Sequence, residues 1–374
     1  MKTLKDIGEL KGKKVLIRVD FNVPIENGKV VDPYRIEKSL PTINFLREKG
    51  ARLLLISHLD EKSGETLRPV AEYIEKYFPV KFSDDFFGEQ SLNAITELHE
   101  GEVVLFENLR NNEGEESNDK AFAKNLASLG EIYVNDAFSV SHREHASIVG
   151  LPQFLPSYAG LQMQAEIKNL VEVFHPPHPF LFILGGAKFD TKLPLIQKFL
   201  SLADYVFVGG ALANNFFKEE GLNVGKSLVT EGDFHIHEEL ADHKLILPTD
   251  VTVEVLGKKV IKATNKVEDD EVILDAGPET IQLLKDLMPE LKCVLWNGPL
   301  GNYEKGFTES TIELGKILAE SKVKSIVGGG DTLAAIASSG VEDKISFVST
   351  GGGAMLQFLL DETLPGIEAL KASK

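Results

Sequence analysis

The segment SIVGGGDTLAAI, residues 325–336, joins an apolar strand to an apolar helix through three glycines and an Asp-Thr pair. Glycines let backbone N–H groups approach a phosphate closely, and the start of the following helix presents its positive end to the same place. In such a loop Asp331 can hold the magnesium ion of a nucleotide, although a plain glycine turn with Asp331 as the helix N-cap is the simpler alternative. A second segment, ISFVSTGGG at residues 345–353, repeats the pattern. Together the two segments predict a parallel α/β sheet whose carboxyl edge binds phosphate.

Three further strands in the carboxyl-terminal half also run into glycine, in FLFILGGAK at 180–188, YVFVGG at 205–210 and VLWNGPLG at 294–301. One extended anionic ligand along one sheet edge explains five such strand ends better than five separate turns do. Lys188 and Lys192 are four residues apart, which places both ammonium groups on one face of the following helix. The Walker A spacing is absent here, so a standard P-loop is not indicated.

Composition sets the broad class of the protein. The chain has 374 residues and a formal net charge of -17. At about 150 residues per domain this length predicts two domains, and the acidic balance argues against nucleic acid or an acidic membrane as a partner. No apolar run approaches the roughly 18 residues that cross a bilayer, and the first residues lack the apolar core of a signal peptide, so we expect a cytoplasmic protein. The single cysteine, Cys293, excludes an internal disulfide and is expected to be a small core residue.

In the amino-terminal half, Arg and His residues recur where predicted strands end. Arg18, Asp20 and Asn22 are predicted to share one face of a strand, where charged residues need either a ligand or a structural ion pair. Arg35 lies in the first turn of a helix predicted over 32–48, where a cation opposes the helix dipole but can meet an anion. Further Arg and His residues follow predicted strands in SHL at 57–59, ENLR at 107–110, YVNDAF at 133–138 and SHREH at 141–145. Because the carboxyl ends of parallel strands meet at one edge, these residues predict an anion site.

The order of the elements predicts two lobes. Strands and helices alternate up to about residue 155, and a helix over 161–174 followed by Pro-Pro-His-Pro at 176–179 separates this region from the next strand. The predicted fold class is α/β, with two Rossmann-like lobes that each hold a parallel sheet flanked by helices, joined by a helix with a hinge. The expected boundaries are a first domain at 1–160, a connecting helix and linker at 161–178 and a second domain at 179–355.

The motifs and their order resemble the phosphoglycerate kinase family over nearly the whole chain: RVDFNVP, LPTI, SHL, ENLR, YVNDAF, HREHAS, LGGAK, GKSL, WNGP, GGGDT and STGGGA. The resemblance implies that the first domain binds 3-phosphoglycerate, the second binds ATP or ADP with Mg²⁺, and residues 356–374 pack back on the first domain. It implies reversible phosphoryl transfer between 1,3-bisphosphoglycerate and ADP by a monomer. Such transfer depends on positioning and cations and needs no protein nucleophile.

The resemblance also implies two sets of site residues, position by position. The set on the acid side is Asp20, Phe21, Asn22, Arg35, His58, Arg110, His142, Arg143 and His145. The set on the nucleotide side is Gly185, Gly186, Lys188, Lys192, Gly210, Asn297, Pro299, Glu304, Gly328, Gly329, Gly330, Asp331, Thr332, Gly351 and Gly352. Within these sets the resemblance implies catalytic roles for Arg35 and Lys192, and it makes Asp331 the metal ligand.

The chain departs from the family pattern after His58, where Asp60-Glu61-Lys62 replaces Gly-Arg-Pro. A carboxylate at this place faces an anionic substrate, and unit charges several Å apart repel by about 1 to 4 kcal/mol. We expect Lys62 to offset part of that repulsion and the acid to bind weakly. Two alternatives follow, a non-catalytic nucleotide-binding relative with a degraded acid site and a kinase for another small phosphorylated acid. Smaller departures occur at Asn111-Asn112, Asp190-Thr191, Ala211 and Gln357.

Overall fold

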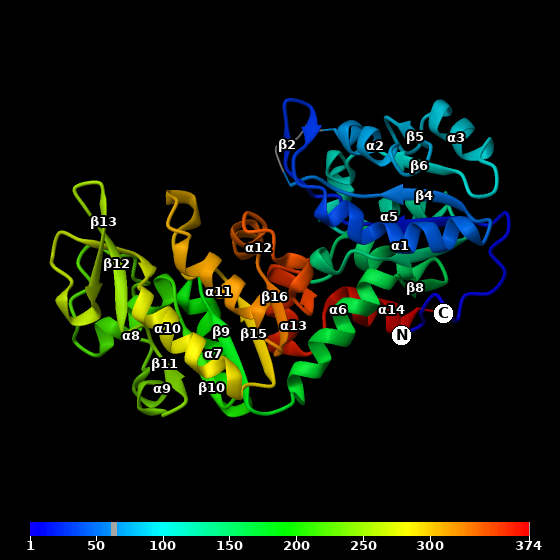
Figure 1. Ribbon diagram of the computed structural model, residues 1–374. Coiled ribbons are helices and arrows are strands. Elements are labelled where there is room, and N and C mark those ends of the chain that lie inside the picture. The colour runs from blue at the N-terminus through cyan, green and yellow to red at the C-terminus, as the bar shows by residue number, and fades with distance from the viewer. Residues whose placement is uncertain (61–65, 374) are drawn as a thin grey trace. The chain divides into compact units, whose positions relative to one another are not determined.

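The computed structural model describes residues 1–60 and 66–373 and divides into two compact units. Unit 1 comprises Met1–Lys168 together with Asp361–Lys374, and unit 2 comprises Asn169–Leu360. Each unit contains a parallel sheet with helices beside it, which confirms the predicted α/β class (Figure 1). The chain passes between the units within α6 (Leu161–Val171) and at the end of α13 (Gly353–Asp361).

The sheet of unit 1 has the order β5-β6-β4-β1-β7-β8, and all its neighbouring strands are parallel. Its central strands are continuous apolar runs because both faces of a parallel sheet are covered. The chain leaves β1 first toward β4 and later places β7 on the other side, so the order reverses at β1 and opens a crevice at its carboxyl end. The strands are β1 (Lys14–Arg18), β4 (Arg52–Ile56), β5 (Val80–Ser83), β6 (Val103–Phe106), β7 (Ile132–Asn135) and β8 (Ser157–Ala159).

The helices of unit 1 follow their strands as in other βαβ folds. They are α1 (Tyr34–Glu48), α2 (Arg68–Ile74), α3 (Glu89–Thr96), α4 (Glu113–Glu116), α5 (Lys120–Ala127) and α14 (Pro365–Ala372), and a short hairpin pairs β2 (Ile25–Glu26) with β3 (Lys29–Val30). The carboxyl-terminal helix α14 packs within unit 1, where the amide of Gly366 donates to the carbonyl of Ser141 at 2.8 Å. At the start of α6, the buried Asp136 accepts hydrogen bonds from the amides of Gln162 and Met163.

The main sheet of unit 2 has the order β11-β10-β9-β15-β16-β17 and is also parallel. Here the order reverses at β9, which lies between β10 and β15, so the corresponding crevice opens at the carboxyl end of β9. The strands are β9 (Phe180–Leu184), β10 (Tyr205–Val208), β11 (Leu245–Ile246), β15 (Cys293–Asn297), β16 (Lys324–Gly328) and β17 (Phe347–Val348). The remaining helices of the unit are α7 (Phe189–Leu202), α8 (Ala211–Glu219), α9 (His237–Ala241), α10 (Pro278–Leu287), α11 (Glu309–Glu320) and α12 (Gly330–Ala337).

Unit 2 also holds a three-stranded antiparallel sheet that the sequence patterns above did not predict. Its strands are β12 (Asp250–Val255), β13 (Lys258–Ala263) and β14 (Val272–Ala276), in the order β13-β12-β14. Leu256 and Gly257 form the two-residue turn between β12 and β13 with φ values of 49° and 74°, as in a type I′ hairpin. Val251 and Val253 of β12 pack with Phe217 of α8 in a small core of their own.

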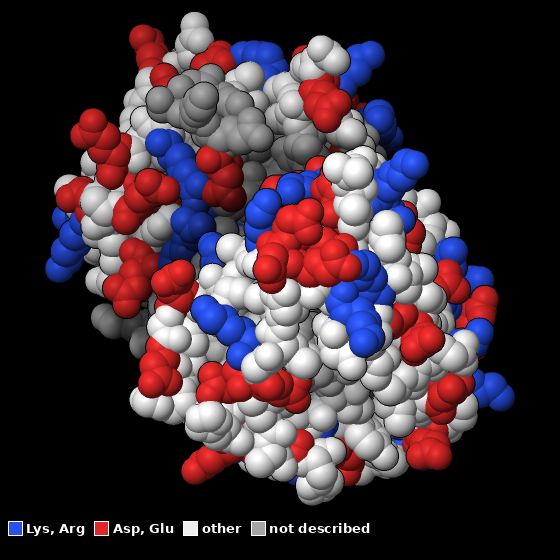
Figure 2. Space-filling view, turned by 90° about the vertical axis from the view of Figure 1, so that its left-hand side faces the viewer, with Lys and Arg blue, Asp and Glu red and all other residues white. Residues whose placement is uncertain are grey.

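Three features predicted from composition can be compared with the structure: the surface charge, the character of the helices and the environment of Cys293. On the face shown in Figure 2, acidic side chains are interspersed with basic ones. Within residues 1–60 and 66–373, no helix combines the length and the apolar character that a membrane span requires. Cys293 is buried in β15, as expected of a core residue.

Candidate active site

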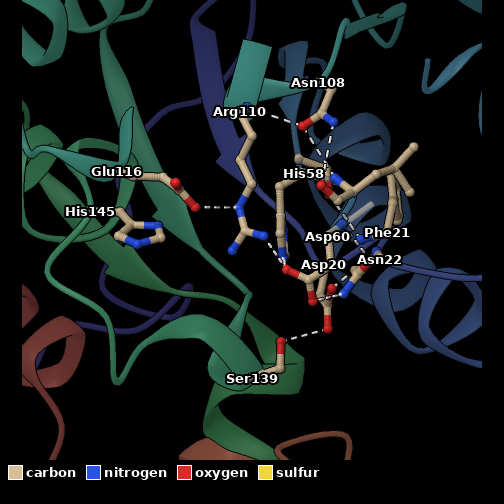
Figure 3. Close-up of polar contacts among 12 residues, drawn as sticks. Asp20, Phe21, Asn22, His58, Asp60, Asn108, Arg110, Glu116, Ser139 and His145 are labelled. Atoms are coloured by element: carbon tan, nitrogen blue, oxygen red, sulfur yellow. Dashed lines mark hydrogen bonds and ion pairs between the residues drawn. The ribbon is translucent and has the colours of Figure 1, made fainter. Parts of the chain in front are cut away.

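The polar residues predicted in the amino-terminal half gather at the carboxyl edge of the unit 1 sheet. They come from the loops that follow β1, β4, β6 and β7 (Figure 3), and from the first turn of α1. We call them the acid-side cluster, which comprises Asp20, Asn22, Arg35, His58, Arg110, His142, Arg143 and His145. This edge is where the strand order reverses, so the topology alone brings segments more than 100 residues apart to one place.

Asp20 and Arg35 form an ion pair within this cluster. Arg35 Nη1 donates to Asp20 Oδ2 at 2.8 Å, and the Ser139 hydroxyl donates to the same oxygen. The prediction that Arg18, Asp20 and Asn22 share one face of a strand is wrong, because β1 ends at Arg18 and the chain then enters a loop. In that loop the amide of Asn22 donates to Asp20 Oδ1 at 3.1 Å, so the carboxylate itself holds the loop.

His58 is held as a neutral donor. Arg18 Nη2 lies 3.1 Å from His58 Nδ1, and a guanidinium can only donate, so Nδ1 accepts and the ring proton is on Nε2. Burial, together with Arg18 and Arg110, holds the pKa of His58 well below its usual range. Nε2 is buried and has no hydrogen-bond partner among the described residues, which leaves an N–H available to a ligand.

Arg18 is itself fixed by a buried chain of hydrogen bonds that sequence patterns did not reveal. Arg18 Nε donates to the Ser147 hydroxyl at 2.9 Å, and that hydroxyl donates to Glu115 Oε1 at 2.6 Å. Glu115 is fully buried, and burial raises the pKa of its carboxyl group. Because this chain sets the tautomer of His58, Glu115 and Ser147 act on the cluster through Arg18.

Arg110 is the most constrained cation of the cluster. Its Nη1 pairs with the Asp60 carboxylate and its Nε lies 3.1 Å from Glu116 Oε1, while the side chain is only 15% exposed. Asp60 was expected to repel the substrate with Lys62 as its counter-ion. Glu61 and Lys62 lie outside the described residues, and the described counter-ion of Asp60 is Arg110.

The loop after β7 adds the last three members of the cluster. Burial, followed by Arg110 and Arg143, lowers the pKa of His145 to about 4, so this imidazole is neutral at neutral pH. His142 is also shifted, since burial and then Arg143 lower its pKa. Arg143 is exposed and makes no ion pair with any residue that the structure describes. The cluster therefore offers three guanidinium groups and neutral imidazoles to an anionic ligand.

In unit 2 a cavity of ≈ 540 Å³ lies beside the carboxyl ends of β9, β10 and β15. Five predicted nucleotide-side residues line it: Gly186, Gly210, Pro299, Glu304 and Asp331. Its apolar wall was missed from the sequence and includes Phe217, Leu228, Ile273, Leu274 and Tyr303. The polar and apolar halves of this lining are what an adenine nucleotide requires of a site.

The other predicted nucleotide-side residues do not line this cavity within the described part of the chain: Gly185, Lys188, Lys192, Asn297, Gly328, Gly329, Gly330, Thr332, Gly351 and Gly352. Some of these glycines serve packing between loops. A Cβ on Gly185 would lie 2.3 Å from the carbonyl oxygen of Pro299, so only glycine fits there. A Cβ on Gly210, whose φ is 61°, would likewise lie 2.6 Å from the amide nitrogen of Gly186. They bring the ends of β9, β10 and β15 close together.

Lys192 lies beside these loops in the first turns of α7. Its Nζ donates to the carbonyl of Gly185 at 2.7 Å. The pKa of Lys192 is lowered to about 8, chiefly by burial, with Asp331 opposing the shift and Lys188 adding to it. The three charged side chains are therefore close enough to influence one another. An ammonium held at this cost is typical of a functional position.

The interpretation of Asp331 as a helix cap is wrong. α12 begins at Gly330 with Gly329 as its N-cap, at a φ of 104° that favours glycine, and no side chain caps the helix. Asp331 lies inside the first turn and lines the cavity. Beside it, the buried Thr332 hydroxyl has no hydrogen-bond partner among the described residues.

The residues present fit a magnesium ion that arrives with a nucleotide. Within the described ranges, no group of three or more His, Cys, Asp or Glu side chains could hold a metal. Mg²⁺ in nucleotide sites usually binds through one or two carboxylates plus substrate phosphates and waters. Asp331, which lines the cavity together with the carboxylates of Asp275 and Glu304 and has the Thr332 hydroxyl beside it, can supply one such carboxylate.

Comparison with known proteins places this geometry in a family. Residues 4–362 match the family model described as phosphoglycerate kinase. The chain is 41% identical to the phosphoglycerate kinase of Dictyoglomus turgidum over 99% of both chains, and 40% identical to that of Fervidobacterium nodosum over 100% of this chain and 98% of the other. Its fold is similar to the crystal structure of phosphoglycerate kinase from Pyrococcus horikoshii, with a TM-score of 0.88, 30% identity and coverage of 100% and 99%. The corresponding structure from Coxiella burnetii has a TM-score of 0.83 at 36% identity, with coverage of 99% and 98%.

Proposed function

The chain belongs to the phosphoglycerate kinase family, and we propose that the acid-side cluster and the cavity of unit 2 carry the two halves of its reaction. The protein is a phosphotransferase with a carboxyl group as acceptor. It transfers a phosphoryl group reversibly between 1,3-bisphosphoglycerate and ADP, giving 3-phosphoglycerate and ATP. Nothing in the comparisons favours a non-catalytic relative.

The assignment of the two sites rests on the different chemistry at the carboxyl edges of the two parallel sheets. Unit 1 offers guanidinium groups and neutral imidazole donors, which suit a small acid with a carboxylate and a phosphate. Unit 2 offers an apolar wall, glycine-rich loops and the Asp331 carboxylate, which suit a magnesium nucleotide. We therefore assign 3-phosphoglycerate to unit 1 and ATP or ADP to unit 2.

In the proposed mechanism the protein positions the ligands and stabilises charge. Phosphoryl transfer spreads negative charge over the equatorial oxygens of the moving group, so fixed cations are the main catalytic device. We assign this role to Lys192 on unit 2 and Arg35 on unit 1. Bound Mg²⁺, held by Asp331, would neutralise nucleotide phosphate charge. Neutral His58 and His145 donate or accept hydrogen bonds without adding charge, and Arg110 and Arg143 bind the acid.

A coupled assay with 3-phosphoglycerate and MgATP tests this function. We expect saturable formation of ADP that needs both substrates. Nucleotide binding without turnover would support the non-catalytic alternative. Turnover only with a different phosphorylated acid would support the alternative of a kinase for another small phosphorylated acid. We further propose that the protein works in the cytoplasm, which the family's glycolytic role supports, and that it acts as a monomer.

Asp331 should bind magnesium and contribute little to stability. Asp331→Asn removes the charge but keeps a similar shape, and no capping bond is lost because Asp331 makes none. We expect MgADP to bind at least about tenfold more weakly, with a nearly unchanged melting temperature. Asp286→Asn, on the exposed surface of α10, is the matched control. A collapse of thermal stability with unchanged MgADP affinity would contradict the assignment.

Lys192 should give the enzyme an alkaline limit. Its folded-state pKa of about 8 lies below the ordinary lysine value of 10.5, so the free enzyme loses this positive charge as the pH rises through about 8. We expect kcat/KM for MgATP, which reports the free enzyme, to fall above that pH. Lys192→Arg keeps its charge throughout this range and should abolish the fall, whatever its absolute rate. The same alkaline limb in both enzymes would show that another group titrates.

A further inference from the structure

The carboxylate of Asp60 binds two side chains of the acid-side cluster and lies near a third. It pairs with Arg110 Nη1, accepts from Asn22 Nδ2 at 2.5 Å and lies 3.8 Å from His58 Nε2 (Figure 3). Its own backbone amide donates to Asn22 Oδ1 at 3.0 Å, so the contact with Asn22 is reciprocal. These three partners belong to the acid-side cluster, and an internal anion therefore sits where an external one is expected.

The partners of Asp60 are built into the fold. Asn108 is almost fully buried, and its Oδ1 accepts from the amides of Leu59 at 3.2 Å and Arg110 at 3.0 Å. One side chain therefore ties the loop that carries Asp60 to the loop that carries Arg110. The Asp60 side chain is 46% exposed, whereas that of Arg110 is 15% exposed. A ligand can thus approach and replace the carboxylate while the guanidinium stays in place.

We propose that Asp60 is a specificity-determining residue, an internal carboxylate that competes with the acid substrate for Arg110 and Asn22 and selects for phosphate over carboxylate. The proposal rests on the assignment of 3-phosphoglycerate to unit 1. A tethered group acts at an effective concentration of about mM when the link is short. An external carboxylate makes the same kind of bond to Arg110 as Asp60 does, so it competes poorly with the tethered group. A phosphate carries more charge and a third oxygen, and so it can displace Asp60.

The size of the effect follows from occupancy. If Arg110 is engaged by Asp60 in roughly nine molecules of ten, the apparent dissociation constant of the acid is raised about tenfold. Removing the charge of Asp60 should remove this competition for every anion. It should help monocarboxylates most, since they are the ligands that Asp60 excludes. The nucleotide should be unaffected, because its proposed site is in unit 2.

Asp60→Asn tests the proposal, because an amide keeps one acceptor oxygen for Asn22 but has no charge with which to form an ion pair with Arg110. We expect the KM for 3-phosphoglycerate to fall about tenfold while the KM for MgATP stays unchanged. Glycerate, the unphosphorylated acid, should become a measurable competitive inhibitor. The matched control is Asp84→Asn, which removes an exposed carboxylate paired with Arg68 on the same unit and changes the net charge equally. This control should leave both constants unchanged.

A second readout separates this proposal from the proposed function. Inorganic sulfate binding, followed by calorimetry without nucleotide, should be tighter in Asp60→Asn than in Asp84→Asn even if neither enzyme turns over. Asp60→Gly should behave like Asp60→Asn and covers the case in which the amide disturbs the loop. Absence of turnover with tighter sulfate binding would overturn the function and leave the role of Asp60 standing. Equal acid constants and equal sulfate affinities in the Asp60 and Asp84 variants would overturn the role of Asp60.

Discussion

Lys192→Ala should lower turnover by about 10²-fold or more, the size expected when a preorganised charge is lost from a transition state. The ammonium is held against the carbonyl of Gly185 at the end of β9, beside Lys188 and Asp331. Burial disfavours its charge, so the fold maintains this lysine at a cost in stability. Steady-state kinetics with saturating MgATP and 3-phosphoglycerate measure the effect.

The stability of the same variant provides the control. Because the folded-state pKa of Lys192 is depressed, the unfolded chain binds the proton more tightly, and removing the ammonium should leave the melting temperature at pH 7 unchanged or raised. Lys316→Ala, an exposed lysine on α11, should change neither quantity. Full turnover in a folded Lys192→Ala enzyme would show that another group stabilises the moving phosphoryl.

Arg35→Ala should lower kcat by about 10²- to 10³-fold, because it removes the second charge proposed to act in the transition state. Arg35 Nη1 is held at 2.8 Å from Asp20 Oδ2, so the guanidinium is positioned before any ligand binds. MgADP affinity should not change, since the nucleotide is assigned to unit 2. Kinetics combined with MgADP calorimetry measure both effects.

Two variants separate catalysis by Arg35 from support of Asp20. Arg35→Lys keeps a point charge near Asp20 but loses the planar fork, so it should recover stability and only part of the rate. Arg68→Ala, a surface arginine paired with Asp84, should be nearly neutral. If Arg35→Lys recovered full activity, or if MgADP affinity fell together with the rate, the assigned role would be wrong.

Much of the fold was predictable because the strands are long apolar runs that end in glycine or in polar residues. Runs such as 180–184 and 52–56 are short and buried on both faces, and the glycine or polar residues that bound them favour strands of a parallel sheet. The antiparallel hairpin at 250–263 was missed although its alternating valines carry a period-2 signal. Its turn residue Leu256, rather than Asn or Asp, hid the two-residue loop.

The predicted site residues were chosen by motif, and their contacts depend on tertiary structure. Sequence placed Asp60 opposite the substrate but could not pair it with Arg110, which lies 50 residues away. The hydrogen bonds from Arg18 to Ser147 and from Ser147 to Glu115 join three segments that are far apart in the sequence, so no local pattern reveals them. Asp331 is a residue type that often caps a helix, but here the helix begins two residues earlier than that role requires. Its N-cap is Gly329, whose positive φ favours glycine.

Direct transfer of the phosphoryl group tests the central claim most closely. The protein is incubated with γ-labelled MgATP and 3-phosphoglycerate, and the acyl phosphate is trapped with hydroxylamine, which releases the label and leaves the hydroxamate of the acid. The account predicts that hydroxamate forms in proportion to ADP, needs Mg²⁺ and is reduced at least about 10²-fold in rate in Lys192→Ala and Arg35→Ala. ADP formation without hydroxamate, or hydroxamate formation at full rate in both variants, would contradict it.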